Sequence, residues 1–216
     1  MSRPKQRSKR LLKKLPELVA ERLAQRNRGD HRPVLIFAQD EARFGRISIT
    51  RKSWAPAGIR PRSPRQVIRK YVYAYSAVCP ATGKMTSLIL PKANSEMMSL
   101  FLQQVSSDFA DYFIIMLVDR AGWHVSARLK IPENIRLIPI PSHSPELNPT
   151  EHVWDELREK HFPNLALKTL DDVEDKLCDG LNAMTDDPER LRSLTYFPYL
   201  HIAVYVATWY WSFPCG

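Results

Sequence analysis

Two long apolar runs dominate the hydrophobic pattern of this chain, and each is followed by an aspartate. The first, VLIFAQ at 34–39, leads into Asp40 and Glu41, and the second, YFIIMLV at 112–118, leads into Asp119. Continuous apolar runs of this length are typical of strands buried on both faces of a parallel sheet. If the two strands are parallel neighbours, both aspartates lie at the carboxyl edge of the sheet, where open α/β sheets bind ligands.

Helical spacing of apolar residues predicts helices around these strands. A first amphipathic helix covers 11–26, and a crossover helix covers 94–109 with Asn94 or Ser95 as its N-cap. The apolar stripe of the crossover helix is formed by Met97, Leu100, Phe101 and Val105. A short helix is expected after Asp119, closed by Pro132, and the segment from Thr169 onward predicts a helix with an acidic outer face.

The stretch SPELNPTEHVWDEL, residues 144–157, predicts the start of another helix. Asn148 is a suitable N-cap, Pro149 suits the first turn, and Glu151 completes a capping-box-like pattern. Three apolar residues would then face the sheet, namely Val153, Trp154 and Leu157. On this stretch taken by itself, helix capping is the simpler explanation of Glu151.

The remaining pattern predicts a hairpin, a short strand and an exposed arm. The segments 69–79 and 84–91 are β-prone and joined by the turn PATG, and NIRLIPIP at 134–141 indicates a further strand. The stretch 54–65 is rich in proline and arginine, which favours an extended surface arm. Together the elements predict an α/β fold with a mixed central sheet flanked by helices.

Composition fits one folded domain outside the membrane. The chain has 216 residues, of which 44% are hydrophobic and 25% charged, enough for one core with tails. The three cysteines, Cys79, Cys178 and Cys215, are too far apart and odd in number for a disulfide framework, which fits a reducing cytoplasm. No apolar run approaches the roughly 18 residues that a membrane span needs, and the basic start lacks the apolar stretch of a signal peptide.

The charge distribution predicts a polyanionic partner. The net charge is +9, and the stretch from Ala42 to Ser95 holds eleven lysines or arginines and no acidic residue. We therefore expect nucleic-acid binding, with a merely basic, solvated surface as the alternative. Trp54 could stack on a base or pack in the core. The candidate DNA contacts are Arg43, Arg51, Lys52, Trp54, Arg60, Arg62, Arg65 and His124.

Asp40, Asp119 and Glu151 are the candidate catalytic and metal-binding residues. Each has a plain structural explanation as a turn or cap residue. If they converge, however, their charges repel one another unless a cation lies between them. Oxygen-only ligation suits Mg²⁺ or Mn²⁺, and a pair of such ions serves phosphodiester chemistry. Beside them, Glu41 is expected to be a structural residue or ion-pair partner, and His124 to contact DNA, to orient a carboxylate or to lie on a helix surface.

Three motifs carry a resemblance to a known family. FAQDEARFG, LVDRAGWH and PSHSPELNPTEHVWDELREK, in this order, resemble the DDE transposases of bacterial insertion sequences related to the mariner group. The resemblance implies a ribonuclease H-like fold in which Asp40, Asp119 and Glu151 bind two Mg²⁺ or Mn²⁺ ions. It implies a catalytic domain at 34–200, between a basic lead-in segment with one helix at 1–33 and an aromatic C-terminal tail at 201–216. Arg120 departs from the asparagine of many relatives.

The same resemblance implies cut-and-paste DNA transposition. The protein would hydrolyse the phosphodiester at the transposon ends and transfer the freed strand to target DNA, as a homo-oligomer on DNA in the bacterial cytoplasm, associated with the nucleoid. A ribonuclease H-like nuclease without strand transfer and an inactive DNA-binding remnant remain the alternatives. Relatives usually carry helix-turn-helix modules ahead of the core, and residues 1–33 are too few for one. We therefore expect a separately encoded helix-turn-helix part, and little sequence preference in this chain by itself.

Overall fold

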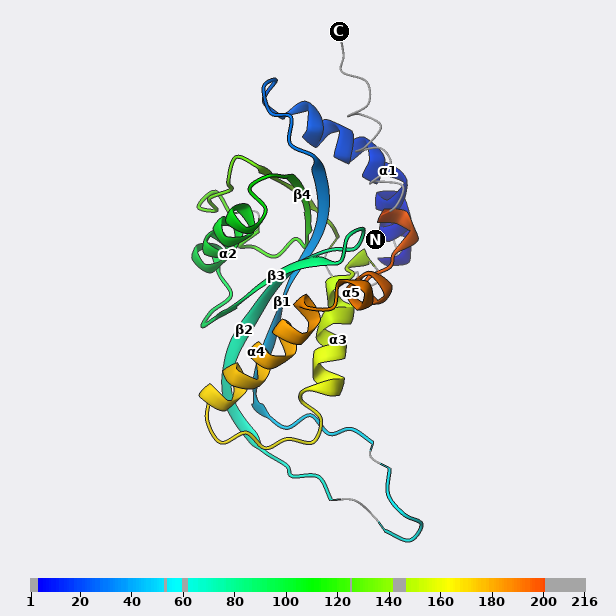
Figure 1. Cartoon of the computed structure of the whole chain (residues 1–216), viewed down its shortest axis with the longest axis vertical. Coiled ribbons are helices and arrows are strands. Elements are labelled where there is room, and N and C mark those ends of the chain that lie inside the picture. Colours follow the sequence, from blue (N-terminus) through cyan, green and yellow to red (C-terminus); the bar gives the residue numbers. More distant parts are fainter. Residues whose placement is uncertain (1–3, 53, 60–61, 125, 142–146, 201–216) are drawn as a thin grey trace.

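A five-stranded mixed sheet forms the centre of the protein (Figure 1). The computed structural model describes residues 4–52, 54–59, 62–124, 126–141 and 147–200. The sheet order is β3-β2-β1-β4-β5. Its strands are β1 (Val34–Ile47), β2 (Val67–Cys79), β3 (Lys84–Leu90), β4 (Phe113–Val118) and β5 (Ile135–Pro139). β1, β2 and β3 pair antiparallel, whereas β4 is parallel to both β1 and β5, so the predicted mixed sheet and its hairpin are confirmed.

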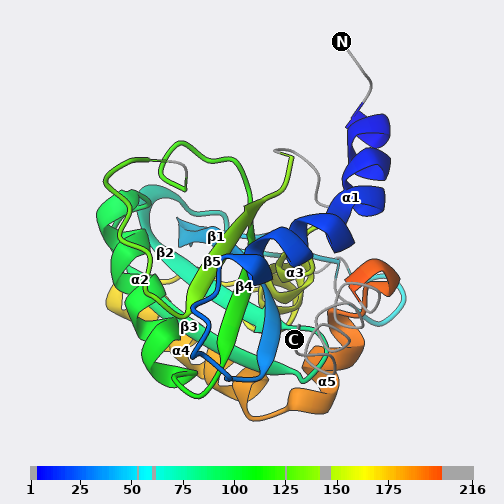
Figure 2. The same cartoon turned by 90° about the horizontal axis from the view of Figure 1, so that it is seen from above.

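Helices cover both faces of this sheet (Figures 1 and 2). They are α1 (Pro4–Ala24), α2 (Ser95–Asp108), α3 (Thr150–Lys160), α4 (Asp171–Thr185) and α5 (Pro188–Leu194). α2 packs on one face through Met98, Phe101, Leu102 and Val105. α3, α4 and α5 pack on the other face, over β1, β2 and β3. Within the described ranges, no helix is both long and apolar enough to cross a membrane.

The lead-in helix α1 belongs to the core of the protein. Its Leu15, Val19 and Leu23 are buried in one cluster with Ile36 of β1 and Ile115 of β4. The apolar stripe that predicted this helix is therefore the surface that packs on the sheet. As a result, α1 packs on the same face of the sheet as α3 and α4, but it covers β4 and β5.

The first strand is longer than its apolar run predicts. β1 does not end before Asp40 but continues to Ile47, because β2 pairs with it along this whole stretch. Pairing with β4, in contrast, stops at Ala38 opposite Leu117. Asp40 therefore lies inside β1, two residues beyond Ala38, the last residue of β1 that pairs with β4.

Several local features of the structure differ from the prediction. The helix expected after Asp119 does not form, since residues 120–132, apart from 125, lie in turns or irregular backbone. Phe101 and Val105 of the predicted apolar stripe are buried, but Leu100 is 47% exposed, because Met98 and Leu102 complete the buried face of α2 instead. Pro149 precedes α3 rather than lying in its first turn. The short helix α5 carries too few residues for a recognisable period and was not predicted.

Gly83 is the residue that lets the β2–β3 turn approach α5. Its φ is +72°, and a Cβ there would lie 2.0 Å from the carbonyl oxygen of Pro188. We predict that Gly83→Ala lowers the free energy of unfolding by about 2–4 kcal/mol, through backbone strain and the clash. Gly29→Ala is the control, since no atom lies within 4 Å of its Cβ position. Equal urea midpoints for the two variants would contradict this packing.

Candidate active site

Asp40 lies in a partly buried, negatively charged environment. The indole Nε1 of Trp154 donates a hydrogen bond to its Oδ2 at 3.0 Å. Burial raises the pKa of the Asp40 carboxyl, and the negative charges of Glu151 and Glu41 raise it further, to about 7. The indole hydrogen bond acts in the opposite direction but is outweighed. Asp40 is thus a carboxyl group whose charge the surrounding protein disfavours.

Buried hydrogen bonds place Glu151 beside Asp40. The hydroxyl of Thr150 donates to the carbonyl of Ala38 at 3.0 Å, and the amide of Asn148 donates to the carbonyl of Gln39 at 3.4 Å. Both bonds attach the start of α3 to the backbone of β1 directly before Asp40. The side chain of Asn148 also accepts from the backbone N–H of Thr150 at 3.2 Å, so its predicted capping role is modified: it satisfies the first amide of the helix from two residues away.

Asp119 follows the last residue of β4 and is held by its own loop. Its Oδ1 accepts hydrogen bonds from the backbone N–H of Ala121 at 2.8 Å and from Nδ1 of His124 at 2.7 Å. On the other side of the ring, Nε2 of His124 lies 2.8 Å from Oε1 of Glu41. The same Glu41 oxygen accepts from the indole of Trp123 at 3.3 Å. The chain Asp119–His124–Glu41 therefore crosses from the edge of the sheet to β1.

His124 is buried, and its charge is stabilised by its partners. Its side chain is 0% exposed. Burial by itself lowers the pKa of the imidazole, but the hydrogen bonds to Asp119 and Glu41 outweigh it and raise the pKa to about 10. The expectation of a DNA contact at His124 is corrected, because no part of the ring reaches the surface. The ion-pair role expected for Glu41 is confirmed.

The three predicted carboxylates are only partly brought together. Glu151 is close enough to Asp40 for its charge to raise the pKa of the Asp40 carboxyl. Asp119 stands at the same carboxyl edge of the sheet, with its Oδ1 directed to His124. Among the residues that the structure describes, no three His, Cys, Asp or Glu side chains are arranged to hold a metal ion.

The basic arm between β1 and β2 projects away from the sheet (Figure 1). The side chain of Asn164 attaches both ends of the arm to the rest of the protein. Its Oδ1 accepts hydrogen bonds from the backbone N–H of Arg51 and from the hydroxyl of Ser63, each at 3.0 Å. Beyond this anchor Trp54 is fully exposed, which excludes the alternative of core packing. The remaining described candidates, Arg43, Lys52, Arg62 and Arg65, are exposed too. Arg60 lies outside the described residues.

Sequence reasoning missed the residues that hold the carboxylates in place. Trp154 was expected to pack on the sheet, and its ring does, but its N–H also bonds Asp40. Thr150 and Trp123 were given no role. A signal existed for Trp154, because it lies one helical turn after Glu151 and its indole needs an acceptor when buried. The hydroxyl of Thr150 gave no comparable signal.

Comparison with known sequences identifies a family. The sequence model of the family described as DDE superfamily endonuclease matches residues 35–174, more than half of the chain. The chain is also 36% identical over 132 residues to the uncharacterized protein y4pE/y4sA of Sinorhizobium fredii (strain NBRC 101917 / NGR234). That match covers 61% of this chain and 98% of the other protein.

Solved structures of the Mos1 transposase share the fold. The Mos1 mariner paired end complex with Mn matches with a TM-score of 0.58 at 14% identity, over 96% of this chain and 64% of that chain. The paired-end complex with left transposon end gives a TM-score of 0.55 at 16% identity, over 90% and 63%. The chain thus spans a little less than two thirds of the length of these transposases.

The family match and the structural likeness agree with the fold that the strands show. At identities this low, the structural likeness establishes the fold alone. The fold is ribonuclease H-like, and the parallel strands β1 and β4 lie next to each other in its sheet. The family match covers Asp40, Asp119 and Glu151 together. On these grounds the chain belongs to the DDE superfamily endonucleases.

Proposed function

We propose that this chain is the catalytic part of a bacterial insertion-sequence transposase, which cuts DNA at the transposon ends and joins the freed strand to target DNA. The observation that carries the proposal is the environment of Asp40. Burial and the negative charges of Glu151 and Glu41 raise the pKa of this carboxyl group to about 7. Such an arrangement is unfavourable in the protein by itself, and a cation removes the conflict.

The donor set fits Mg²⁺ or Mn²⁺. Asp40, Asp119 and Glu151 offer carboxylate oxygens, the ligands that these ions prefer, and we propose that they hold two ions, an arrangement that serves phosphodiester chemistry. When bound, the ions would offset the charge of the three carboxylates and polarise the phosphodiester under attack. The remaining contribution comes from the chain: Trp154 orients Asp40, and the bonds of Thr150 to β1 hold Glu151 beside it.

The basic arm is proposed to hold the DNA backbone near this site. Arg51, Lys52, Arg62 and Arg65 are exposed on it and lack acidic neighbours in the sequence. Trp54 is fully exposed, so we propose that a base stacks on it. Because charge reads phosphates and not base sequence, we also propose that a helix-turn-helix part outside residues 34–200 recognises the ends.

Assembly on DNA is part of the same proposal. Three of the similar Mos1 structures are paired-end complexes, and another is a strand transfer complex that matches with a TM-score of 0.55 at 15% identity, over 91% of this chain and 64% of that chain. By analogy, two or more copies of this chain would act on paired ends, in a bacterial cytoplasm and on the nucleoid.

Asp40→Asn should show that Asp40 is destabilising without metal. The folded pKa near 7 lies above the unfolded value of about 4, so the carboxyl favours folding below about pH 4 and this contribution is lost as the pH rises toward 7. In EDTA, the variant should gain about 1–3 kcal/mol over wild type at pH 8 and less at pH 5. The asparagine oxygen can still accept from Trp154. Urea unfolding at both pH values measures the difference, and a gain that does not change with pH would contradict it.

Asp40→Asn, Asp119→Asn and Glu151→Gln should each abolish Mg²⁺-dependent DNA cleavage while DNA binding persists, since each removes one anionic ligand with little change in shape. Asp155→Asn is the matched control, because Asp155 is an exposed carboxylate on the same helix as Glu151. The substrate is a plasmid with the DNA that flanks the coding region, and pre-cut ends test joining separately. Cleavage without joining would indicate a nuclease, and activity in Asp119→Asn would refute the triad.

Arg62→Ala with Arg65→Ala should weaken duplex binding and reduce its salt dependence. Each lost phosphate contact lowers the slope of log affinity against log salt by roughly 0.9. The control is Arg128→Ala with Lys130→Ala, which removes the same charge from exposed residues beside α2. Fluorescence anisotropy titrations at several salt concentrations give the slopes. Equal slopes for the two double variants would show that the arm makes no special contact.

A further inference from the structure

The structure assigns a positioning role to two residues outside the carboxylate triad. We propose that His124 fixes the carboxylate of Asp119 at the sheet edge, and that Glu41 fixes His124. This inference rests on the proposed function, in which Asp119 takes part in metal-dependent chemistry. Neither residue needs to contact metal or DNA, since both would act through Asp119.

The first support is that the imidazole is bound at both ends. Nδ1 of His124 lies 2.7 Å from Oδ1 of Asp119 and 3.1 Å from its backbone oxygen, while Nε2 lies 2.8 Å from Oε1 of Glu41. A histidine held through one nitrogen can still tilt about that bond. Rotation of this ring breaks hydrogen bonds on both sides, so the direction from which it donates to Asp119 is fixed.

The second support is the difference in burial along the chain of three side chains. The side chain of Glu41 is 6% exposed and that of His124 is 0% exposed, whereas that of Asp119 is 37% exposed. The indole of Trp123 also donates to Glu41. The inner end is therefore held by packing and hydrogen bonds, and the outer end opens to solvent, where a ligand of Asp119 would arrive.

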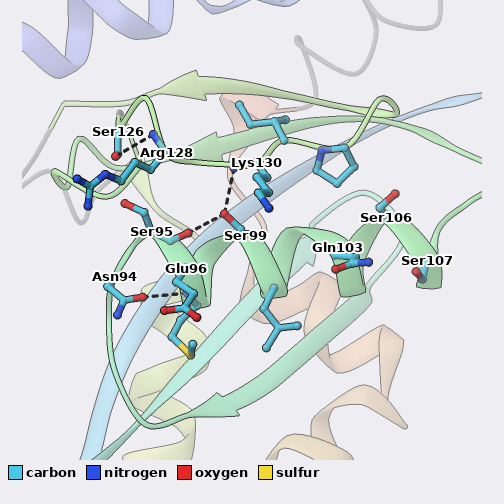
Figure 3. A pocket seen from close by; sticks show the side chains of 14 residues that line it. Asn94, Ser95, Glu96, Ser99, Gln103, Ser106, Ser107, Ser126, Arg128 and Lys130 are labelled. Atoms are coloured by element: carbon cyan, nitrogen blue, oxygen red, sulfur yellow. Dashed lines mark hydrogen bonds between the residues drawn. The ribbon is translucent and has the colours of Figure 1, made fainter.

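The third support is the anchoring of the loop that carries His124. Although the loop forms no helix, α2 holds it: the hydroxyl of Ser95 donates to the carbonyl of Trp123 at 3.4 Å. The hydroxyl of Ser99 accepts from the backbone N–H of Lys130 at 3.0 Å. Figure 3 shows these serines on α2, on the side of the helix that faces the loop, where they help to line a hollow of about 1250 Å³. The loop is thus a fixed support for the imidazole.

The fourth support is the alternation of side chains along β1. Consecutive residues of a strand point to opposite faces, so Asp40 faces α3 while Glu41 faces the side covered by α2. β1 thereby positions both aspartates of the site. It carries Asp40 directly, and it sets Asp119 through Glu41 and His124.

The test compares two amides at position 124. The side-chain nitrogen of asparagine lies near the place of Nδ1 and can still donate to Asp119, whereas that of glutamine lies near the place of Nε2 and reaches toward Glu41. Mn²⁺ affinity of the full chain, measured by calorimetry without DNA, should fall about 10–100-fold in His124→Gln and less in His124→Asn. Both variants lose a buried ion pair, so both should lose stability. The loss of Mn²⁺ affinity, in contrast, is expected to be much larger in His124→Gln than in His124→Asn.

Two further variants complete the design. Glu41→Gln keeps an acceptor for His124 but removes the charge, so it tests the inner end if the His124 variants do not fold; its Mn²⁺ affinity should also fall. Asp155→Asn, which removes an exposed carboxylate that touches neither His124 nor Asp119, should bind Mn²⁺ as wild type does. Wild-type affinity in His124→Gln or in Glu41→Gln, or equal losses in the two His124 amides, would overturn the proposal.

Asp119→Asn separates this inference from the proposed function. If that variant keeps wild-type Mn²⁺ affinity, Asp119 is no ligand, and the proposed function fails together with the inference. If it loses affinity while His124→Gln keeps it, the inference fails and the proposed function stands. The Mg²⁺ concentration that gives half-maximal cleavage should rise in the same order as the Mn²⁺ dissociation constant.

Discussion

The parallel pairing of β1 with β4 determines where the chemistry of this protein can take place. Consecutive apolar residues of the two strands pair in one register, which ends with Ala38 opposite Leu117. Continued by two residues, that register brings Asp40 and Asp119 to the same level of the sheet. A slip of one residue would turn Asp40 toward the opposite face and put Glu41 in its place. Burial of apolar side chains thus fixes the position of the charged ones.

The carboxylates of the site are unfavourable for the stability of the fold that holds them. Burial and the neighbouring carboxylates raise the pKa of Asp40, and the bonds from Trp154 and Thr150 keep the site in place despite this. Active sites commonly carry such local conflicts, which the rest of the structure outweighs. Here the large apolar clusters on both sides of the sheet provide the opposing stability. A divalent cation would then relieve the conflict and complete the site.

The sequence predicted the elements and the carboxylates, because these depend on local patterns. Apolar runs that end in Asp40 and Asp119 predicted parallel strands, and their motifs led to the family that the comparison confirmed. The length of β1 was missed, since it depends on pairing with β2. The burial of His124 was missed too, because its partner Glu41 lies 83 positions away. Contacts of this kind follow from the assembled sheet and have no local signature.

Asp40, Asp119 and Glu151 are proposed to share divalent metal just beyond the point where the pairing of β1 with β4 ends. The most direct measurement is anomalous X-ray diffraction from crystals of the full chain with duplex DNA and Mn²⁺. We expect anomalous peaks within coordinating distance of the carboxylates of Asp40, Asp119 and Glu151, with His124 still bonded to Asp119. Peaks elsewhere, with these three carboxylates free of metal at saturating Mn²⁺, would contradict it.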